Sequence, residues 1–220
     1  MKVKALVFDL DGTLLDTLED LADAVNAVLE GAGFAPHPVD AYRYFVGSGL
    51  ETMLRRAAPE GTDDGTLAGL ALSFREVYAK HWEAKTRPYT GVEAMLEALV
   101  KTGLPFAVLS NKPHDFTQLC VRRFFPSVTF TAVQGSPKGG RAKPDPAMAL
   151  ALARDFSVAP GEVLFVGDSS VDMDTATAAG MIPAGALWGF RTESELVEHG
   201  ARVLLAKPSE ILDLLGAVSK

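Results

Sequence analysis

The stretch Val7-Phe8-Asp9-Leu10-Asp11-Gly12-Thr13 decides the fold, because a short apolar run ends there in two carboxylates and a glycine. The apolar run is typical of a buried strand. Open α/β sheets bind ligands at the carboxyl ends of their strands, and Asp9 and Asp11 stand at such an end. Two carboxylates at a turn suit a pair in which one attacks an electrophile and the other transfers a proton. We therefore predict catalytic roles for Asp9 and Asp11.

Aspartates and a glycine at such spacing also occur in two other kinds of loop. An EF-hand loop requires a preceding helix and a glycine at its sixth position, whereas Gly12 is the fourth residue from Asp9 and follows a strand. The EF-hand is therefore excluded. A structural Asx turn that only shapes the strand exit stays open for the local string taken alone.

Further short apolar runs predict more buried strands, and helical patterns separate most of them. Runs with little alternation are typical of a parallel sheet covered on both faces. The order of strands and helices predicts a doubly wound, mainly parallel α/β core with right-handed crossovers. The predicted strands are Ala5–Phe8, Phe106–Leu109, Thr129–Val133, Val163–Val166 and Val203–Leu205. The helices predicted between them are Val92–Lys101, Asp115–Phe124, Pro146–Phe156, Ser170–Ala179 and Ser209–Ala217.

Residues 16–86 interrupt this alternation with helical patterns alone. Leu18, Leu21, Val25 and Val28 form an apolar stripe, and Thr17 with Asp20 resembles a capping box at its start. The segment Thr86–Gly91 has the proline and glycine of a boundary linker. We predict an all-helical domain, residues 16–86, inserted into a core formed by residues 1–15 and 87–220. Its further helices are expected at Val39–Phe45, Leu50–Ala58 and Thr66–Ala84.

Other predicted strand ends carry residues suited to an anion. Ser110-Asn111-Lys112 is followed by Pro113, which is favoured in the first turn of a helix. A hydroxyl, an amide and backbone N–H groups at a helix start make a phosphate cradle. A plain helix cap is the alternative for this tripeptide alone. Lys143, in a loop before another helix, can neutralise a phosphoryl oxygen, although most lysines are solvated surface charges.

Asp168 and Asp172 complete the set at the end of the predicted strand Val163–Val166. They stand four residues apart and face the same side once the helix begins. Carboxylate oxygens collected in this way bind Mg²⁺, which takes few protein ligands and keeps several waters. We therefore predict a magnesium site that includes these two residues.

Composition excludes several classes of protein. The 220 residues include 21 basic and 28 acidic side chains, a net charge of −7. Without a Lys/Arg run, this balance argues against a nucleic-acid or anionic-membrane partner.

Cys120 is the single cysteine, which excludes an intrachain disulfide and a multi-cysteine zinc site. The start lacks the apolar stretch of a signal peptide, and the run Ala178–Phe190 is too short to span a bilayer. We expect a cytoplasmic protein with no membrane partner.

The four groups of residues, taken together, resemble the motifs of the haloacid dehalogenase-like superfamily of phosphohydrolases. They occur in the family's order, each at or just past a predicted strand end, and the resemblance covers nearly the whole chain. It implies a Rossmann-like core with an inserted helical cap. The motifs are Asp9-Leu10-Asp11-Gly12-Thr13, Ser110-Asn111, Lys143-Pro144 and Gly167-Asp168 with Asp172.

The resemblance also implies a role for each of these residues. Asp9 resembles the nucleophile that becomes an aspartyl-phosphate, and Asp11 the general acid that later activates water. Mg²⁺ would be held by the carboxylates of Asp9 and Asp168 and the backbone carbonyl of Asp11, with Asp172 as a direct or indirect partner. The phosphoryl oxygens would be gripped by Ser110, Asn111 and Lys143.

The segment Val46–Leu50 resembles the glycine-bearing cap loop of phosphoglycolate phosphatases. Gly47 and Gly49 let backbone N–H groups turn inward around an anion, and with Ser48 they are the predicted specificity loop. A tight helix–helix turn is the alternative. Arg43, Arg55 and Arg56 are nearby cations whose facing the sequence leaves open.

We therefore expect a Mg²⁺-dependent phosphatase of a small phosphorylated metabolite, with 2-phosphoglycolate the first choice, acting as a monomer or homodimer. Pyrophosphate, another small phosphomonoester and phosphosugar mutase activity stay open within the same superfamily. A dehalogenase is disfavoured because Asp11 has no comparable duty in carbon–halogen displacement. A non-catalytic phosphate-binding regulatory module is the alternative of a different class.

Overall fold

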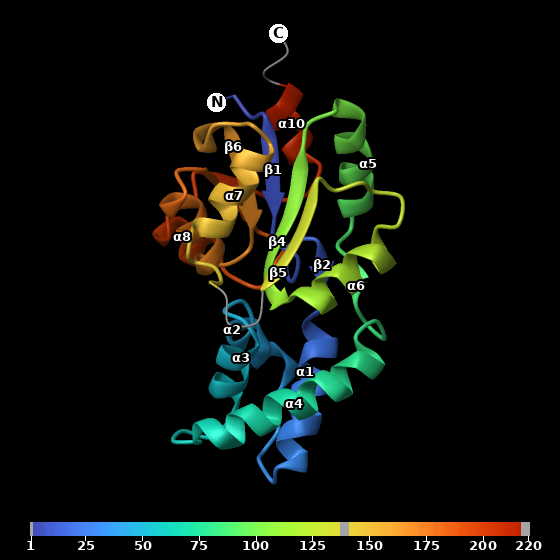
Figure 1. Cartoon of the computed structure of the whole chain (residues 1–220), viewed down its shortest axis with the longest axis vertical. Helices are drawn as coiled ribbons and strands as arrows, with labels where there is room; N and C mark the ends of the chain where they lie inside the picture. The colour runs from blue at the N-terminus through green and yellow to red at the C-terminus, as the bar shows by residue number, and fades with distance from the viewer. Residues whose placement is uncertain (1, 137–140, 217–220) are drawn as a thin grey trace.

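The computed structural model describes residues 2–136 and 141–216, and its centre is a six-stranded parallel sheet (Figure 1). The strands follow the order β5-β4-β1-β6-β7-β8, so β1 lies between β4 and β6. A strand order that runs in both directions from β1 is that of a doubly wound fold. The strands are β1 (Ala5–Phe8), β4 (Phe106–Pro113), β5 (Ala132–Ser136), β6 (Val163–Gly167), β7 (Ile182–Ala186) and β8 (Val203–Leu205).

Helices cover both faces of the sheet, which explains why its central strand is apolar throughout. Ala5 and Val7 point to the face covered by α7 (Ala147–Asp155) and α8 (Ser170–Ala178). Leu6 and Phe8 point to the other face, toward the helices α5 (Val92–Thr102), α6 (His114–Phe124) and α10 (Glu210–Gly216). All four β1 side chains are fully buried. The remaining helix of this part, α9 (Glu193–Glu198), precedes β8.

Three strand predictions need correction. Strand β4 ends at Pro113 instead of Leu109, so Ser110, Asn111 and Lys112 lie within it. Strand β5 begins at Ala132, whereas the prediction placed its start at Thr129. The Phe130 ring lies outside the ladder and packs against Phe106, with 5.2 Å between the ring centroids. Strand β7 was not predicted, since its sequence Ile-Pro-Ala-Gly-Ala carries the proline and glycine of a turn. Its fully buried position between β6 and β8 favours these small residues; a Cβ on Gly185 would lie 2.9 Å from the Leu196 side chain.

The helices between Leu18 and His81 form a cap beyond the carboxyl ends of the strands (Figure 1). Its longest helices, α1 and α4, pack against each other, and their apolar residues belong to the same core as Leu6 and Phe8. This arrangement confirms the predicted fold class of an α/β core with an inserted helical cap. The cap helices are α1 (Leu18–Gly31), the 3₁₀ turn η1 (Val39–Ala41), α2 (Tyr42–Phe45), α3 (Leu50–Ala57) and α4 (Asp64–His81).

A short antiparallel ladder joins the two chain crossings between sheet and cap. Strand β2 (Leu15–Asp16) pairs with β3 (Arg87–Pro88), so Asp16 stands opposite Arg87. The predicted capping box at Thr17 is wrong. The Asp20 carboxylate accepts hydrogen bonds from the backbone N–H groups of Lys85 and Thr86, and so ties α1 to the returning chain.

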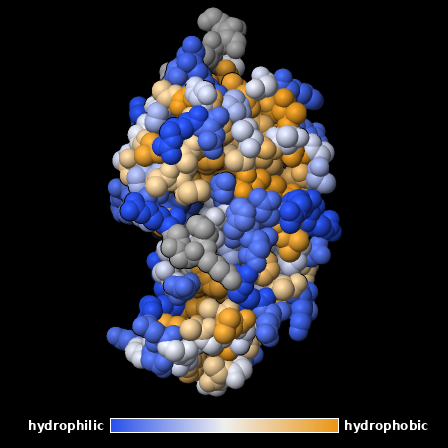
Figure 2. Space-filling model, viewed as in Figure 1, coloured by the Kyte–Doolittle hydropathy of each residue, from blue (hydrophilic) through white to orange (hydrophobic). Residues whose placement is uncertain are grey.

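The surface carries hydrophilic and hydrophobic residues interspersed over both parts, and its outline is notched between them on the face shown in Figure 2. Within residues 2–136 and 141–216, no helix combines the length and the apolar character needed to cross a membrane.

Candidate active site

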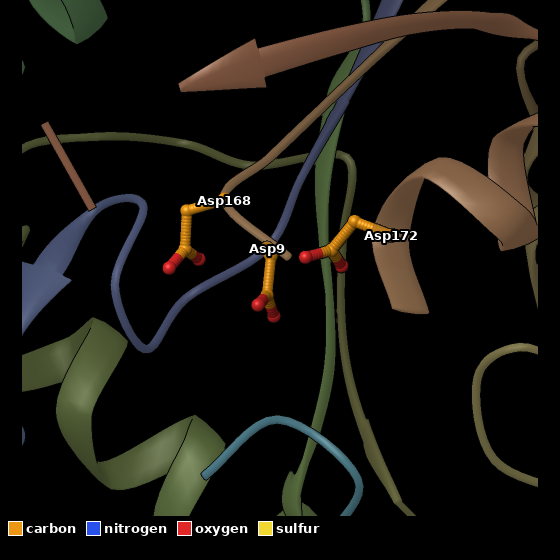
Figure 3. Close-up of side chains that lie close together, drawn as sticks. All are labelled: Asp9, Asp168 and Asp172. Atoms are coloured by element: carbon orange, nitrogen blue, oxygen red, sulfur yellow. The ribbon is translucent and has the colours of Figure 1, made fainter. Parts of the chain in front are cut away.

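Three aspartates meet at the carboxyl end of the sheet. Asp9 follows β1, Asp168 follows β6, and Asp172 lies in the first turn of α8. Their carboxylates point toward a common space (Figure 3), and one oxygen from each lies within 4.8 Å of the others. All three residues are buried. Asp9 and Asp168 are more than 150 residues apart in the sequence. They meet because parallel strands end at the same edge of the sheet.

Lys143 provides the positive charge within this cluster. Its ammonium lies 2.8 Å from Asp9 Oδ1 and 2.6 Å from Asp172 Oδ1. The other Asp172 oxygen accepts hydrogen bonds from the backbone N–H and hydroxyl of Ser169, which makes the capping box of α8. Asp172 is thereby held by both oxygens, and it orients the Lys143 ammonium beside Asp9.

One lysine does not balance three buried carboxylates. Burial raises the pKa of Asp9 from 3.8 to about 7, and the Asp172 charge adds to this effect while Lys143 opposes it. Burial likewise raises the pKa of Asp168 to about 8, with the charges of Asp172 and Asp9 contributing. The cluster therefore favours binding of a further positive charge.

The donor set fits a magnesium ion. The contact between Lys143 and Asp9 Oδ1 is an ion pair without hydrogen-bond geometry, so this buried oxygen has no hydrogen bond within the described residues. Carboxylate oxygens such as those of Asp9 and Asp168 are the hard ligands that Mg²⁺ prefers. Asp172 offers less, since one of its oxygens is paired with the Lys143 ammonium at 2.6 Å and the other accepts two hydrogen bonds from Ser169.

Asp168 is fixed by groups from two other loops. Its Oδ1 accepts a hydrogen bond from the Thr13 hydroxyl at 3.0 Å, and its Oδ2 accepts one from the Phe190 N–H at 2.8 Å. Gly12, at φ +90°, passes so close that a Cβ there would lie 2.3 Å from Asp168 Oδ2. The loop Asp9–Thr13 therefore needs glycine both for its backbone angle and for the space that Asp168 occupies.

Asp11 is paired with a lysine for which the sequence predicted no role. The Lys112 ammonium lies 2.9 Å from Asp11 Oδ1, and the Thr17 hydroxyl donates to the same oxygen at 2.8 Å. Lys112 is buried. The sequence offers one indication that Lys112 belongs to the site. Lys112 directly follows Ser110 and Asn111, so a chain that brings these two residues to the site also brings Lys112 close to it.

The predicted phosphate-binding residues lie beside this pair but differ in what they contact. Ser110 is buried within β4, and its oxygen accepts the Lys112 N–H. The Asn111 amide donates to the carbonyls of Gly47 and Lys143, both at 2.9 Å, and accepts the Lys143 N–H at 2.8 Å. Asn111 thus holds the cap loop and the Lys143 loop in place.

A pocket opens between these residues and the cap, with about 480 Å³ of space that is partly open to solvent. Its polar end is formed by Asp9, Asp11, Ser110, Asn111 and Lys112, and Gly47 and Gly49 lie at its edge. Ser48 is not among its lining residues; its hydroxyl accepts from Arg56. The cap side is apolar apart from a single phenol, with the lining residues Leu21, Val46, Leu50, Met53, Phe74 and Tyr78. The core adds Pro113 and Phe116.

Comparison with known proteins identifies the family. The model of the haloacid dehalogenase-like hydrolase family matches residues 6–186. A phosphoglycolate phosphatase of Pseudomonas putida KT2440 is 36% identical over 98% of this chain and 78% of its own length. An N-acetylmuramic acid 6-phosphate phosphatase of Pseudomonas aeruginosa PAO1 is 31% identical over 98% of this chain and 96% of its own length.

Solved structures agree with the sequence matches. A crystal structure of a protein assigned as a phosphoglycolate phosphatase from Lactobacillus delbrueckii subsp. bulgaricus superposes with a TM-score of 0.90 at 30% identity. The superposition covers 98% of this chain and 99% of the other. These findings confirm the predicted family, the fold class and the class of phosphoric monoester hydrolase. The chain therefore belongs to the haloacid dehalogenase-like hydrolases.

Proposed function

We propose that this protein is a Mg²⁺-dependent phosphatase that hydrolyses 2-phosphoglycolate to glycolate and phosphate through an aspartyl-phosphate on Asp9. The observation that carries the proposal is the position of Asp9. Its carboxylate lies at the polar end of the pocket, beside Lys143 and within reach of the Asp168 carboxylate. A buried nucleophile with adjacent counter-charge is what attack on an anionic phosphoester requires.

Two displacement steps account for the reaction. A carboxylate oxygen of Asp9 forms a bond to phosphorus while the ester P–O bond breaks, and Asp11 gives its proton to the departing alkoxide. Asp11 then takes a proton from water, whose oxygen bonds to phosphorus as the Asp9 O–P bond breaks. Lys143 balances charge on Asp9 and the phosphoryl oxygens throughout. Bound Mg²⁺, held by Asp9, Asp168 and the Asp11 carbonyl, would supply further charge neutralisation.

The names of the relatives support a substrate that is both a phosphomonoester and an acid. Phosphoglycolate carries a carboxylate on its leaving group, and so does N-acetylmuramic acid 6-phosphate. The larger acid sugar phosphate is therefore the second candidate, and it belongs in the same assay.

Asp9→Asn tests the covalent route. The change removes the attacking charge with little change of volume, so phosphate release from 2-phosphoglycolate should fall to background while the circular dichroism spectrum stays native. Asp64→Asn is the matched control, because the Asp64 side chain is 90% exposed on α4. Acid-quenched wild-type enzyme should carry phosphate on Asp9. Near-normal turnover by Asp9→Asn, or phosphate trapped on another residue, would refute the proposal.

We also propose that residues 16–86 move as a cap on a core of residues 1–15 and 87–220. The pairing of Asp16 with Arg87 in the β2–β3 ladder supports this division, since both chain crossings lie side by side. Closure of such a cap excludes water during the reaction. Identical cap–core angles in structures with and without a phosphate analogue would count against it.

A further inference from the structure

We propose that Lys112 and Tyr78 form a subsite that binds the carboxylate of the leaving group, and that this subsite selects acidic phosphomonoesters. The inference rests on the proposed function and extends it by naming the side chains that recognise the part of the substrate remote from phosphorus. Lys112 belongs to β4 of the core and Tyr78 to α4 of the cap, so the subsite is completed from both sides of the pocket.

Lys112 has hydrogen-bonding capacity to spare. An ammonium has three N–H donors. Within the described part of the chain, the Lys112 ammonium donates hydrogen bonds to the Asp11 carboxylate alone. The side chain is buried and lines the pocket. A buried ammonium gains from a second anionic acceptor more than a solvated one does, because the surroundings screen the attraction less.

Tyr78 presents a buried phenol without a partner. Its hydroxyl makes no hydrogen bond within residues 2–136 and 141–216, although buried hydroxyl groups are normally paired. The ring is fixed by Phe74, stacked at 5.1 Å, and by Phe116, edge-on at 5.0 Å. The Lys112 ammonium lies over this ring, 4.8 Å from its centroid, so the two side chains pack against each other. Burial raises the pKa of Tyr78, so the phenol is a neutral donor.

The position of this pair suits a short acidic leaving group. Asp11, which gives its proton to the leaving oxygen, lies 2.9 Å from the Lys112 ammonium. In 2-phosphoglycolate one methylene separates that oxygen from the carboxylate, so a substrate whose ester oxygen contacts Asp11 brings its carboxylate next to Lys112. The apolar residues around the pair offer no competing partner for a carboxylate.

The cap arginines do not take this role in the structure. Arg43 donates to the Gly189 carbonyl, Arg55 pairs with Asp64, and Arg56 donates to the carbonyls of Tyr44 and Phe45. None of the three is among the described lining residues of the pocket, in which Lys112 is the sole cationic side chain.

The test compares 2-phosphoglycolate with ethyl phosphate, which has a methyl group in place of the carboxylate. The readout is the ratio of the two kcat/KM values in Mg²⁺ for wild type, Tyr78→Phe, Lys112→Met and the control Tyr44→Phe, whose side chain is largely exposed and outside the pocket. A lost hydrogen bond to a charged group predicts that Tyr78→Phe lowers this ratio at least about tenfold. Lys112→Met should lower it further, and Tyr44→Phe should keep the wild-type ratio.

A merely structural role would lower both kcat/KM values equally, so an unchanged ratio in Tyr78→Phe and Lys112→Met overturns the subsite. A wild-type enzyme that hydrolyses both esters equally well overturns it too, while the phosphatase assignment stands. If wild type hydrolyses neither ester, the proposed function fails and the subsite is judged by binding. Calorimetry would then measure the Kd of 2-phosphoglycolate for Asp9→Asn with and without Tyr78→Phe; an equal Kd, or no binding to either, refutes it.

Discussion

The side-chain nitrogen of Asn111 lies 2.9 Å from the carbonyl oxygen of Gly47, and this hydrogen bond ties the end of β4 to the loop between α2 and α3. The same amide holds both backbone groups of Lys143. One residue thus couples the cap loop, the sheet and the loop that supplies the central cation. We therefore predict that Asn111 acts on phosphate through the groups that it positions.

Asn111→Ala should therefore harm stability and activity together. It removes three hydrogen bonds among buried groups, and at roughly 1 kcal/mol each we expect a loss of about 3 kcal/mol in the free energy of unfolding. Turnover should fall because Lys143 is no longer fixed beside Asp9. Urea unfolding and phosphate release measure the two effects.

Gln118→Ala is the matched control for this amide. Gln118 donates one hydrogen bond, to the Val133 carbonyl, and lies outside the pocket lining. We expect a loss of about 1 kcal/mol and unchanged turnover. Equal losses for the two variants would show that Asn111 has no special place in the site.

The carboxylate cluster predicts how stability depends on pH. In the folded protein without metal, the pKa values of Asp9 and Asp168 are about 7 and about 8, above the ordinary 3.8. The folded state therefore binds these protons more tightly than the unfolded state. The contribution of these two groups to the free energy of unfolding is fully present below pH 3.8, and it is lost as the pH rises through 7 and 8.

Mg²⁺ should reverse that loss. The ion competes with protons for the same oxygens, so its stabilising effect should be small at pH 5.5 and large at pH 8.5. Melting temperatures measured in EDTA and in Mg²⁺ across this range test the prediction. A Mg²⁺ effect that does not vary with pH would contradict it, and Asp168→Asn should reduce it.

The sequence predicted the strand ends that carry the chemistry, and the reason is local. Asp9, Ser110 and Asp168 each follow a run of apolar residues, and parallel topology alone then brings such ends to one edge of the sheet. The same logic could not assign Tyr78, because its approach to Lys112 depends on how α4 of the cap packs over β4. Contacts of that kind have no pattern in the sequence.

Two expectations failed for related physical reasons. Thr17 and Asp20 have the spacing of a capping box, but the Thr17 hydroxyl donates to Asp11 and Asp20 accepts from Thr86. Partners brought in by the fold outcompeted the local cap. Strand β7 was missed because the small residues that suit its buried position are also those of turns.

Lys143→Met should be among the most destabilising single changes at the site. The Lys143 side chain is 2% exposed and faces both Asp9 and Asp172, so its removal leaves two buried carboxylates without their shared counter-charge. Breaking a buried pair in this way costs about 3–5 kcal/mol. We expect that loss in urea unfolding at pH 7.5 in EDTA, with turnover at background in Mg²⁺.

Lys4→Met provides the comparison for an exposed pair. Lys4 contacts Glu162 at 2.8 Å, but its side chain is 43% exposed. Such surface pairs contribute less than about 1 kcal/mol. If Lys143→Met cost no more than Lys4→Met, the ion pairs of Lys143 would not be holding the cluster together.

Gly12→Ala should damage the site through space as well as through backbone strain. Gly12 and Gly33 both have positive φ, +90° and +78°, which disfavours any residue with a Cβ by about 1–2 kcal/mol. Around Gly33 a Cβ would meet no described atom within 4 Å, whereas at Gly12 it would lie 2.3 Å from Asp168 Oδ2.

Gly33→Ala therefore measures the strain alone, and we expect it to leave turnover intact. Gly12→Ala must also displace the Asp168 carboxylate from Thr13 and Phe190, so its Mg²⁺ affinity and turnover should fall by at least an order of magnitude. Mg²⁺ titration followed by calorimetry, beside urea unfolding of both variants, separates the two effects. Equal Mg²⁺ affinity in Gly12→Ala and Gly33→Ala would mean that Asp168 does not hold the ion.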